Sequence, residues 1–112
     1  MPSTVSFLHF VLDQLSGVDG VTWRPMMGEF ILYVNGRVFG GVYDDRLLVK
    51  PVPAVLALLP DGKREKPYEG AKEMLLVENT DDRDFLSALV RAAEPELPAS
   101  RSPRDKGKRA GG

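Results

Sequence analysis

The sequence predicts an α+β fold in two layers, with an antiparallel sheet that carries its helices on one face. Two stretches near the ends of the chain place apolar residues at helical spacing. Between them, residues 21–50 alternate like strands and contain tight-turn signals, and two shorter extended segments follow later. We therefore expect the order of one helix, about four strands, one helix, two strands and one helix. A chain of 112 residues holds one such domain.

The first helix is expected over residues 4–16. A Ser-Thr pair can cap its start, and Gly17 can end it in a left-handed conformation. His9 and Asp13 fall on the polar side, four residues apart, and we interpret them as a solvated surface pair rather than a catalytic dyad. The apolar arc that would face the core consists of Phe7, Leu8, Phe10, Val11, Leu12 and Leu15.

Two turns organise the central strands. Asn35-Gly36 is the strongest hairpin signal, because both central residues of a type I′ turn need positive φ. Asp44-Asp45 predicts a second tight turn. Two-residue loops at both places fix the register. The expected pairs are Tyr33 with Val38, Leu32 with Phe39, Val42 with Leu47, and Phe39 with Lys50.

Period-two alternation sorts these strands into two faces. The first is almost wholly apolar and should meet the helices: Ile31, Tyr33, Val38, Gly40, Val42, Leu47 and Val49. The second mixes aromatic and aliphatic groups with three cations, which is typical of an association surface. Its predicted interaction residues are Phe30, Leu32, Arg37, Phe39, Tyr43, Arg46, Leu48 and Lys50.

Gly40 and Gly41 stand side by side in the middle strand. A bulge or a close approach of a helix is the favoured interpretation. A ligand cleft is the alternative.

The second half of the chain again combines helices with extended segments, but these elements are shorter. Pro51-Val52-Pro53 opens a short helix that Pro60-Asp61-Gly62 closes. Residues 63–66 are expected to form a charged, solvated loop, and residues 67–69 a short extended piece. Residues 73–78 predict a buried strand. The last helix is expected over residues 82–93, capped by a Thr-Asp pair.

The net charge of −1 conceals an asymmetry. Residues 1–98 carry ten Lys and Arg against fifteen Asp and Glu, a net of −5, whereas residues 99–112 carry five against one, a net of +4. We divide the chain into a folded domain at residues 1–95 and a disordered basic tail at residues 96–112, because the tail lacks the apolar surface needed for folding.

Composition removes most enzyme chemistry. Without cysteine and with one histidine, the chain lacks thiol nucleophiles and the usual zinc and iron–sulfur ligand sets. Its glycines lack the strand-to-helix setting of a phosphate loop. We expect no enzyme activity, no cofactor and no metal. No stretch reaches the roughly 18 apolar residues of a membrane span, so a soluble, cytoplasmic protein without membrane partners is expected.

One segment is poorly explained by these local rules: Trp23-Arg24-Pro25-Met26-Met27-Gly28-Glu29. It could plug one end of the core. Alternatively, the methionine pair could form an adaptable binding surface, with Arg24 as polar anchor.

From this segment onward the sequence resembles the N-terminal domain of the TfoX/Sxy family. The likeness rests on residues 24–33, with Arg24, Met26, Met27 and Gly28 as its signature, on residues 36–50, and on residues 67–72. It covers roughly residues 4–95. The resemblance implies a secretion-chaperone-like α+β fold without established catalytic residues.

The founding members of this family regulate bacterial competence together with a cyclic-AMP receptor protein at promoters, and they carry a second, C-terminal domain. Only 18 residues follow Glu94 here, so we expect a stand-alone domain.

Three functions remain open. The leading hypothesis is a non-enzymatic regulatory domain that binds a protein partner or a second copy of itself through the second sheet face. The alternative is a nucleic-acid-associated protein that uses Arg37, Arg46, Lys50 and the basic tail. The third is a small-ligand or enzyme site near Arg24, Met26, Met27 and Gly28.

Overall fold

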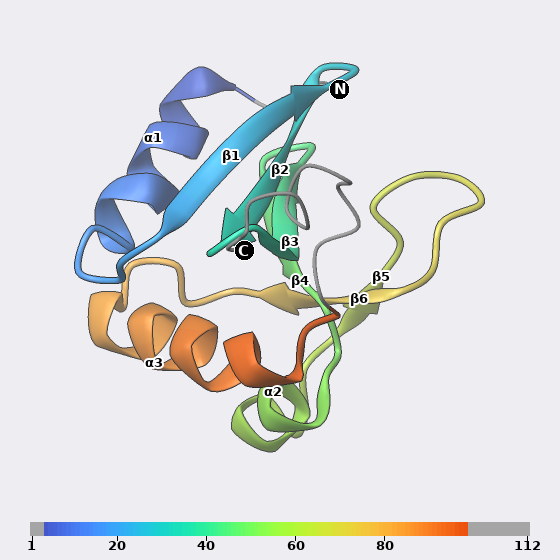
Figure 1. Cartoon of the computed structure of the whole chain (residues 1–112). Coiled ribbons are helices and arrows are strands. Elements are labelled where there is room, and N and C mark those ends of the chain that lie inside the picture. The colour runs from blue at the N-terminus through green and yellow to red at the C-terminus, as the bar shows by residue number, and fades with distance from the viewer. Residues whose placement is uncertain (1–3, 99–112) are drawn as a thin grey trace, which may run out of the picture.

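A computed structural model describes residues 4–98 of the chain. It contains a six-stranded antiparallel sheet with strand order β1-β2-β3-β4-β6-β5, together with three α-helices and a short 3-10 helix, η1. The predicted α+β fold and its order of elements are confirmed (Figure 1). The elements are α1 (Val5–Gln14), β1 (Val21–Met26), β2 (Glu29–Val34), β3 (Arg37–Tyr43), β4 (Arg46–Val49), α2 (Pro53–Leu58), β5 (Arg64–Glu65), β6 (Met74–Val77), α3 (Arg83–Ala93) and η1 (Glu94–Glu96).

Three two-residue turns join the first four strands. Each has both central residues at positive φ, as a type I′ hairpin requires: Met27 and Gly28, Asn35 and Gly36, Asp44 and Asp45. The second and third turns agree with the sequence. The first was missed, since residues 23–29 do not form an irregular connector but a hairpin made of the end of β1, the turn and the start of β2.

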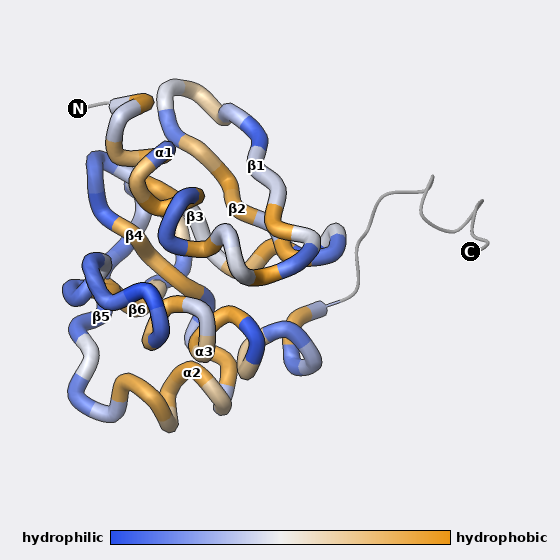
Figure 2. Tube along the Cα trace, turned by 90° about the vertical axis from the view of Figure 1, so that its left-hand side faces the viewer, coloured by the Kyte–Doolittle hydropathy of each residue, from blue (hydrophilic) through white to orange (hydrophobic). Residues whose placement is uncertain are grey.

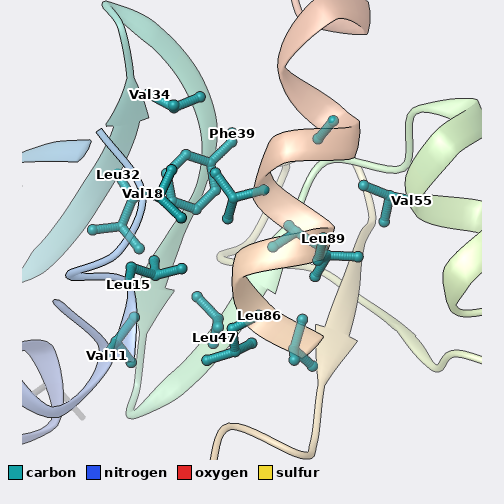
Figure 3. Packing of buried hydrophobic residues seen from close by; sticks show 14 of the residues in the cluster. Val11, Leu15, Val18, Leu32, Val34, Phe39, Leu47, Val55, Leu86 and Leu89 are labelled. Carbon is teal, nitrogen blue, oxygen red and sulfur yellow. The ribbon is translucent and has the colours of Figure 1, made fainter. Parts of the chain in front are cut away.

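The main core lies between the sheet and the helices (Figure 3). All three helices contribute side chains to it, as do β2, β3, β4 and β6. Figure 2 shows apolar residues concentrated in α2, in parts of α1 and α3, and in the strands between them. Both long helices begin at a capped residue: the Thr4 hydroxyl accepts the Phe7 N–H at 3.2 Å, and the Asp82 carboxylate accepts the Phe85 N–H at 3.0 Å.

The pairing register of β2 with β3 differs from the expected one because β3 contains a β-bulge. Tyr33 pairs with Val38 and Val42 with Leu47, as predicted, but Leu32 pairs with Gly40 instead of Phe39. Phe39 is the extra residue. Because one inserted residue reverses the alternation, the side chains of β2 and of the start of β3, up to Phe39, point to faces opposite to those expected, whereas Val42 and Leu47 face the main core as expected.

Gly40 explains why the bulge fits against the next strand. A Cβ at this position would lie 2.1 Å from the Leu48 carbonyl oxygen and 2.9 Å from the Val49 Cα. The residue is therefore required by the close approach of the β4 backbone. The bulge interpretation of the glycine pair is confirmed, and the neighbour that approaches is a strand, not a helix.

The later part of the chain differs from expectation at three places. Arg64 and Glu65 form the edge strand β5, in a segment expected to be a solvated loop, whereas residues 67–69 form no strand. Leu97 packs into the main core, so the packed part extends past residue 95. Residues 99–112 of the predicted tail lie outside the described residues.

Candidate interaction surface

The sheet has one face that is not covered by helices, which we call the outer face. Residues opposite one another in adjacent strands share a face. Since Val42 and Leu47 point into the main core, the neighbouring pairs Tyr43 with Arg46 and Leu48 with Leu76 lie on the outer face. Extended along the sheet, the outer face carries Arg24, Met26, Glu29, Ile31, Tyr33, Val38, Tyr43, Arg46, Leu48, Lys50, Glu65, Met74 and Leu76.

A small second cluster forms the centre of the outer face. Tyr43, Leu48 and Met74 are buried there, with Met26 and Leu76 packed against them. The Tyr43 ring lies over Gly41, where an added Cβ would come within 2.6 Å of it. Tyr68, from the segment between β5 and β6, stands beside that ring with 6.4 Å between centroids. Part of the outer face is thus closed by residues of the sheet and this loop.

The exposed part of the outer face surrounds this cluster. Ile31, Tyr33, Val38 and Leu76 are each half-buried, and Arg24 is exposed. The sequence assigned Ile31, Tyr33 and Val38 to the core, because the alternation it used does not include the bulge. Leu76 lies in a run of four apolar residues, and a run without alternation does not predict which side chains point to which face of the sheet.

Charges on the outer face are mixed. Arg46 forms an ion pair with Glu65 and also donates from Nε to the Tyr43 carbonyl oxygen at 3.1 Å. Burial lowers the pKa of the Lys50 ammonium below its usual value. Burial also raises the pKa of the Tyr43 hydroxyl, and the nearby Tyr68, Glu29 and Tyr33 raise it further.

Four of the predicted interaction residues lie elsewhere, and for them the prediction was wrong. Leu32 and Phe39 are 0% and 2% exposed in the main core, and Phe30 packs against that core. Arg37 points the same way, and its Nη1 donates to the carbonyl oxygens of Glu94 and Leu97 at 3.2 and 3.4 Å. It holds η1 in place and is not an outer-face cation.

The other four predicted residues do lie on the outer face. Tyr43 and Leu48 are buried in its central cluster, whereas Arg46 and Lys50 are half-buried. The outer face therefore carries four of the eight predicted residues, and its role in interaction stays a prediction.

The signature segment forms the β1–β2 hairpin. Arg24 is exposed on the outer face, Met26 packs on the second cluster, and Gly28 has a φ of 88° that suits a glycine. Met27, at the turn, is 97% exposed. Neighbouring side chains of a strand point to opposite faces, so this segment spreads its side chains apart instead of converging them on a ligand.

Other candidate sites lack the required groups. No cluster of three potential metal ligands occurs among residues 4–98. His9 is exposed, and Asp13 pairs with Arg83 at 3.2 Å, so the two helix residues form no dyad. A hollow of about 260 Å³ between the end of α2 and β6 is open and shallow, with Leu58, Leu59 and Leu76 in its lining. Within the described range, no helix is long and apolar enough to cross a membrane.

These observations define a class: a small α+β domain with one helix-covered and one uncovered sheet face. Comparison with known proteins then places it. The chain belongs to the TfoX N-terminal domain family, which matches residues 13–95. It is also 30% identical over 112 residues to an "uncharacterized 12.7 kDa protein in trpE 5′ region" of Spirochaeta aurantia, covering 99% of this chain and 97% of that protein. No solved structure matches the chain.

Proposed function

We propose that this chain is a non-enzymatic regulatory domain that acts by binding another protein through the outer face of its sheet. One observation carries the proposal: half-buried Ile31, Tyr33, Val38 and Leu76 surround a packed centre on a face without helices. A preformed apolar surface with a polar rim suits protein association, because a partner can bury it without first ordering it.

Family membership supports the regulatory part of this proposal. The finer proposal is that the domain acts in the cytoplasm, in transcriptional regulation of the competence type. A partner protein that itself contacts a promoter fits this role. The partner can be a second copy of the chain, and sedimentation at micromolar concentration distinguishes the two cases.

A nucleic-acid partner is the second candidate, favoured by the position of Arg24, Arg46 and Lys50 on a face that also carries tyrosines. Two features weigh against it. Arg46 is paired with Glu65, and Arg37 points to the helix side. Residues 1–98 carry a net charge of −5. A salt-dependent shift of duplex DNA by the full chain would favour this candidate over protein binding.

The test compares two single substitutions that add the same charge. Tyr33→Lys places a cation on the half-buried apolar part of the outer face, beside its packed centre, whereas Ala88→Lys places one on the exposed surface of α3. Both variants should fold, which circular dichroism and thermal melting can verify.

The tagged full chain is then used to capture partners from cells of its own organism. We expect a specific partner that the wild type and Ala88→Lys retain and Tyr33→Lys loses. A partner bound equally by all three proteins contradicts the assignment to the outer face. The absence of any specific partner and of self-association contradicts the binding function itself.

A further inference from the structure

We infer that the β1–β2 turn is the anchor of the protein interface, with Met27 as the side chain that enters an apolar pocket of the partner. This inference rests on the proposed binding function and deepens it. The outer face supplies the broad contact, and the turn at its edge supplies a single inserted side chain. The partner that fits is a protein whose pocket has a neutral or basic rim.

The first observation is a residue that is unfavourable for its backbone. The first position of each tight turn has nearly the same conformation, with φ of 52° at Met27, 51° at Asn35 and 55° at Asp44. Asn and Asp tolerate this left-handed region because their short polar side chains bond locally. Methionine has no such bond, so Met27 raises the free energy of the fold at this position.

The second observation is that, among residues 4–98, Met27 belongs to neither hydrophobic cluster that could compensate for this cost. Asn35 donates to the Glu94 carboxylate at 2.7 Å, and Asp45 accepts the Thr4 N–H at 2.7 Å, so the other turns tie distant segments together. The side chain of Met27 is 97% exposed and packs on no core. A residue that costs stability and gives no internal contact points to a role outside the chain.

The third observation is the set of side chains around the turn. Trp23, on β1, is 40% exposed, and Arg24 beside it is exposed on the opposite face of the strand. Val5 is 57% exposed and starts α1 at the same end of the sheet, since Thr4 is bonded to Asp45. Trp and Arg are the residues most enriched at interface hot spots, and methionine adapts to irregular pockets.

The turn is also held rigidly. The Trp23 ring meets the Phe30 ring edge-on at 5.5 Å across the hairpin, and the Glu29 carboxylate accepts the Asp44 N–H of the adjacent hairpin at 3.0 Å. Figure 1 shows the tip of this hairpin at the upper edge of the molecule. A rigid projection loses little conformational entropy on binding.

Side chains, not backbone, must mediate this contact. β1 is an edge strand, but Pro25 stands within it and has no N–H to offer to an added strand. Strand addition at this edge is thus disfavoured.

The charges at this end select the partner. Glu29, Asp44 and Asp45 lie there, and each takes part in contacts of its own, among them the bonds of Glu29 to the Asp44 N–H and of Asp45 to the Thr4 N–H. An anionic membrane or a nucleic acid would be repelled by three carboxylates, and a nucleic acid offers no apolar pocket for a thioether. A protein pocket with a neutral or basic rim is not repelled by the carboxylates and has apolar space for the Met27 side chain.

A first experiment tests the cost of Met27 without any partner. Met27→Asn keeps the turn and supplies a favourable residue, so its Tm should rise by about 4 °C or more. Met27→Leu keeps an apolar side chain in the same conformation and should leave Tm nearly unchanged. A Tm for Met27→Asn at or below that of the wild type would overturn the argument from backbone cost.

A second experiment locates the partner. A photo-crosslinking amino acid is placed at position 27 of the full chain in its native cells, with position 72, in the exposed loop after β5, as the matched control. We expect one discrete adduct from position 27 alone, with the crosslink mapping to an apolar pocket. Adducts of equal yield from both positions, or none from position 27, would overturn the inference.

Binding measurements with the purified partner then distinguish the anchor role of Met27 from the broader proposal of an outer-face interface. Met27→Asn should weaken binding by about 10-fold or more, as expected for loss of one buried apolar side chain, and Met27→Leu by less than about threefold. Binding that Tyr33→Lys abolishes but Met27→Asn leaves unchanged would refute the anchor and keep the outer-face interface. If Met27→Asn disrupts only sedimentation with phosphatidylglycerol vesicles, the assignment to a protein partner is wrong.

Discussion

The two faces of the sheet differ in how their apolar residues are buried. On the helix side, three helices close a continuous core over four strands. On the outer face, Tyr43, Leu48 and Met74 are buried by strand neighbours, next to the loop that carries Tyr68. Burial of a residue such as Leu48, at 0% exposure, therefore does not imply that it belongs to the main core.

This difference bears on function. The main core cannot accept change without loss of packing, since protein interiors are close-packed. The outer cluster has a thinner cover and a rim of half-buried Ile31, Tyr33 and Leu76. One face thus maintains the fold, and the other leaves apolar surface that a partner can bury.

The largest expected effect is on the helix side. Phe39→Ala should lower the free energy of unfolding by about 3–5 kcal/mol, because it empties the centre of the main core. Urea denaturation measures it, with half-buried Tyr33→Ala on the outer face as the control of smaller effect. A loss below about 1 kcal/mol for Phe39→Ala would contradict the assignment of this side chain to the core.

A comparison of two leucines sharpens the contrast between the faces. Leu32 and Leu48 are both fully buried, on opposite faces. Leu48→Ala should cost about 2–3 kcal/mol, less than Leu32→Ala, because the loop after β5 can move into the space and the helices cannot. Urea denaturation of both variants tests this. An equal or larger loss at Leu48 would show that the outer cluster is as rigid as the core.

The same contrast separates what the sequence could predict from what it could not. The turns at Asn35-Gly36 and Asp44-Asp45 carry the residue types that positive φ selects, so the hairpins and the fold class followed from local rules. The assignment of side chains to the two faces of the sheet did not follow from local rules. A bulge is set by the fit of Gly40 against the β4 backbone, a tertiary contact, and it reversed the facing of Phe30, Leu32 and Phe39.

The turn at Met27-Gly28 was missed for a different reason. Methionine is a poor residue for its φ of 52°, so a rule based on favourable residues excludes it. β5 was missed because its two residues, Arg64 and Glu65, carry no apolar alternation, and the strand is defined by pairing with β6. The candidate site was thus least predictable where a tertiary contact defines an element, as at β5, or where a residue is unfavourable for its backbone, as at Met27.

Two arginines extend the comparison to polar contacts. Arg37, on the helix side, donates to two carbonyl oxygens, whereas Arg46, on the outer face, pairs with Glu65 in a partly exposed setting. Arg37→Met should cost about 1–2 kcal/mol, because it removes a charged donor from the carbonyl oxygens of Glu94 and Leu97. Arg46→Met should cost at most about 1 kcal/mol. Thermal melting of the two variants checks the order, and a reversed order would contradict it.

The smallest effect at neutral pH, and the most specific, concerns Tyr43. Its folded-state pKa is raised above the ordinary value of 10.0, chiefly by burial. The unfolded chain therefore releases this proton first, so the stabilising contribution is complete below pH 10 and is lost as the pH rises toward the folded-state pKa. Tyr43→Phe removes the hydroxyl. Over the interval from about pH 9 to about pH 11, which brackets the ordinary tyrosine pKa, the urea midpoint of this variant should fall less steeply than that of the wild type. Absorbance at the phenolate band gives the same titration directly. Equal slopes for the two proteins would mean that the Tyr43 hydroxyl is as accessible as in the unfolded chain, and that the loop bearing Tyr68 leaves the outer cluster open to water.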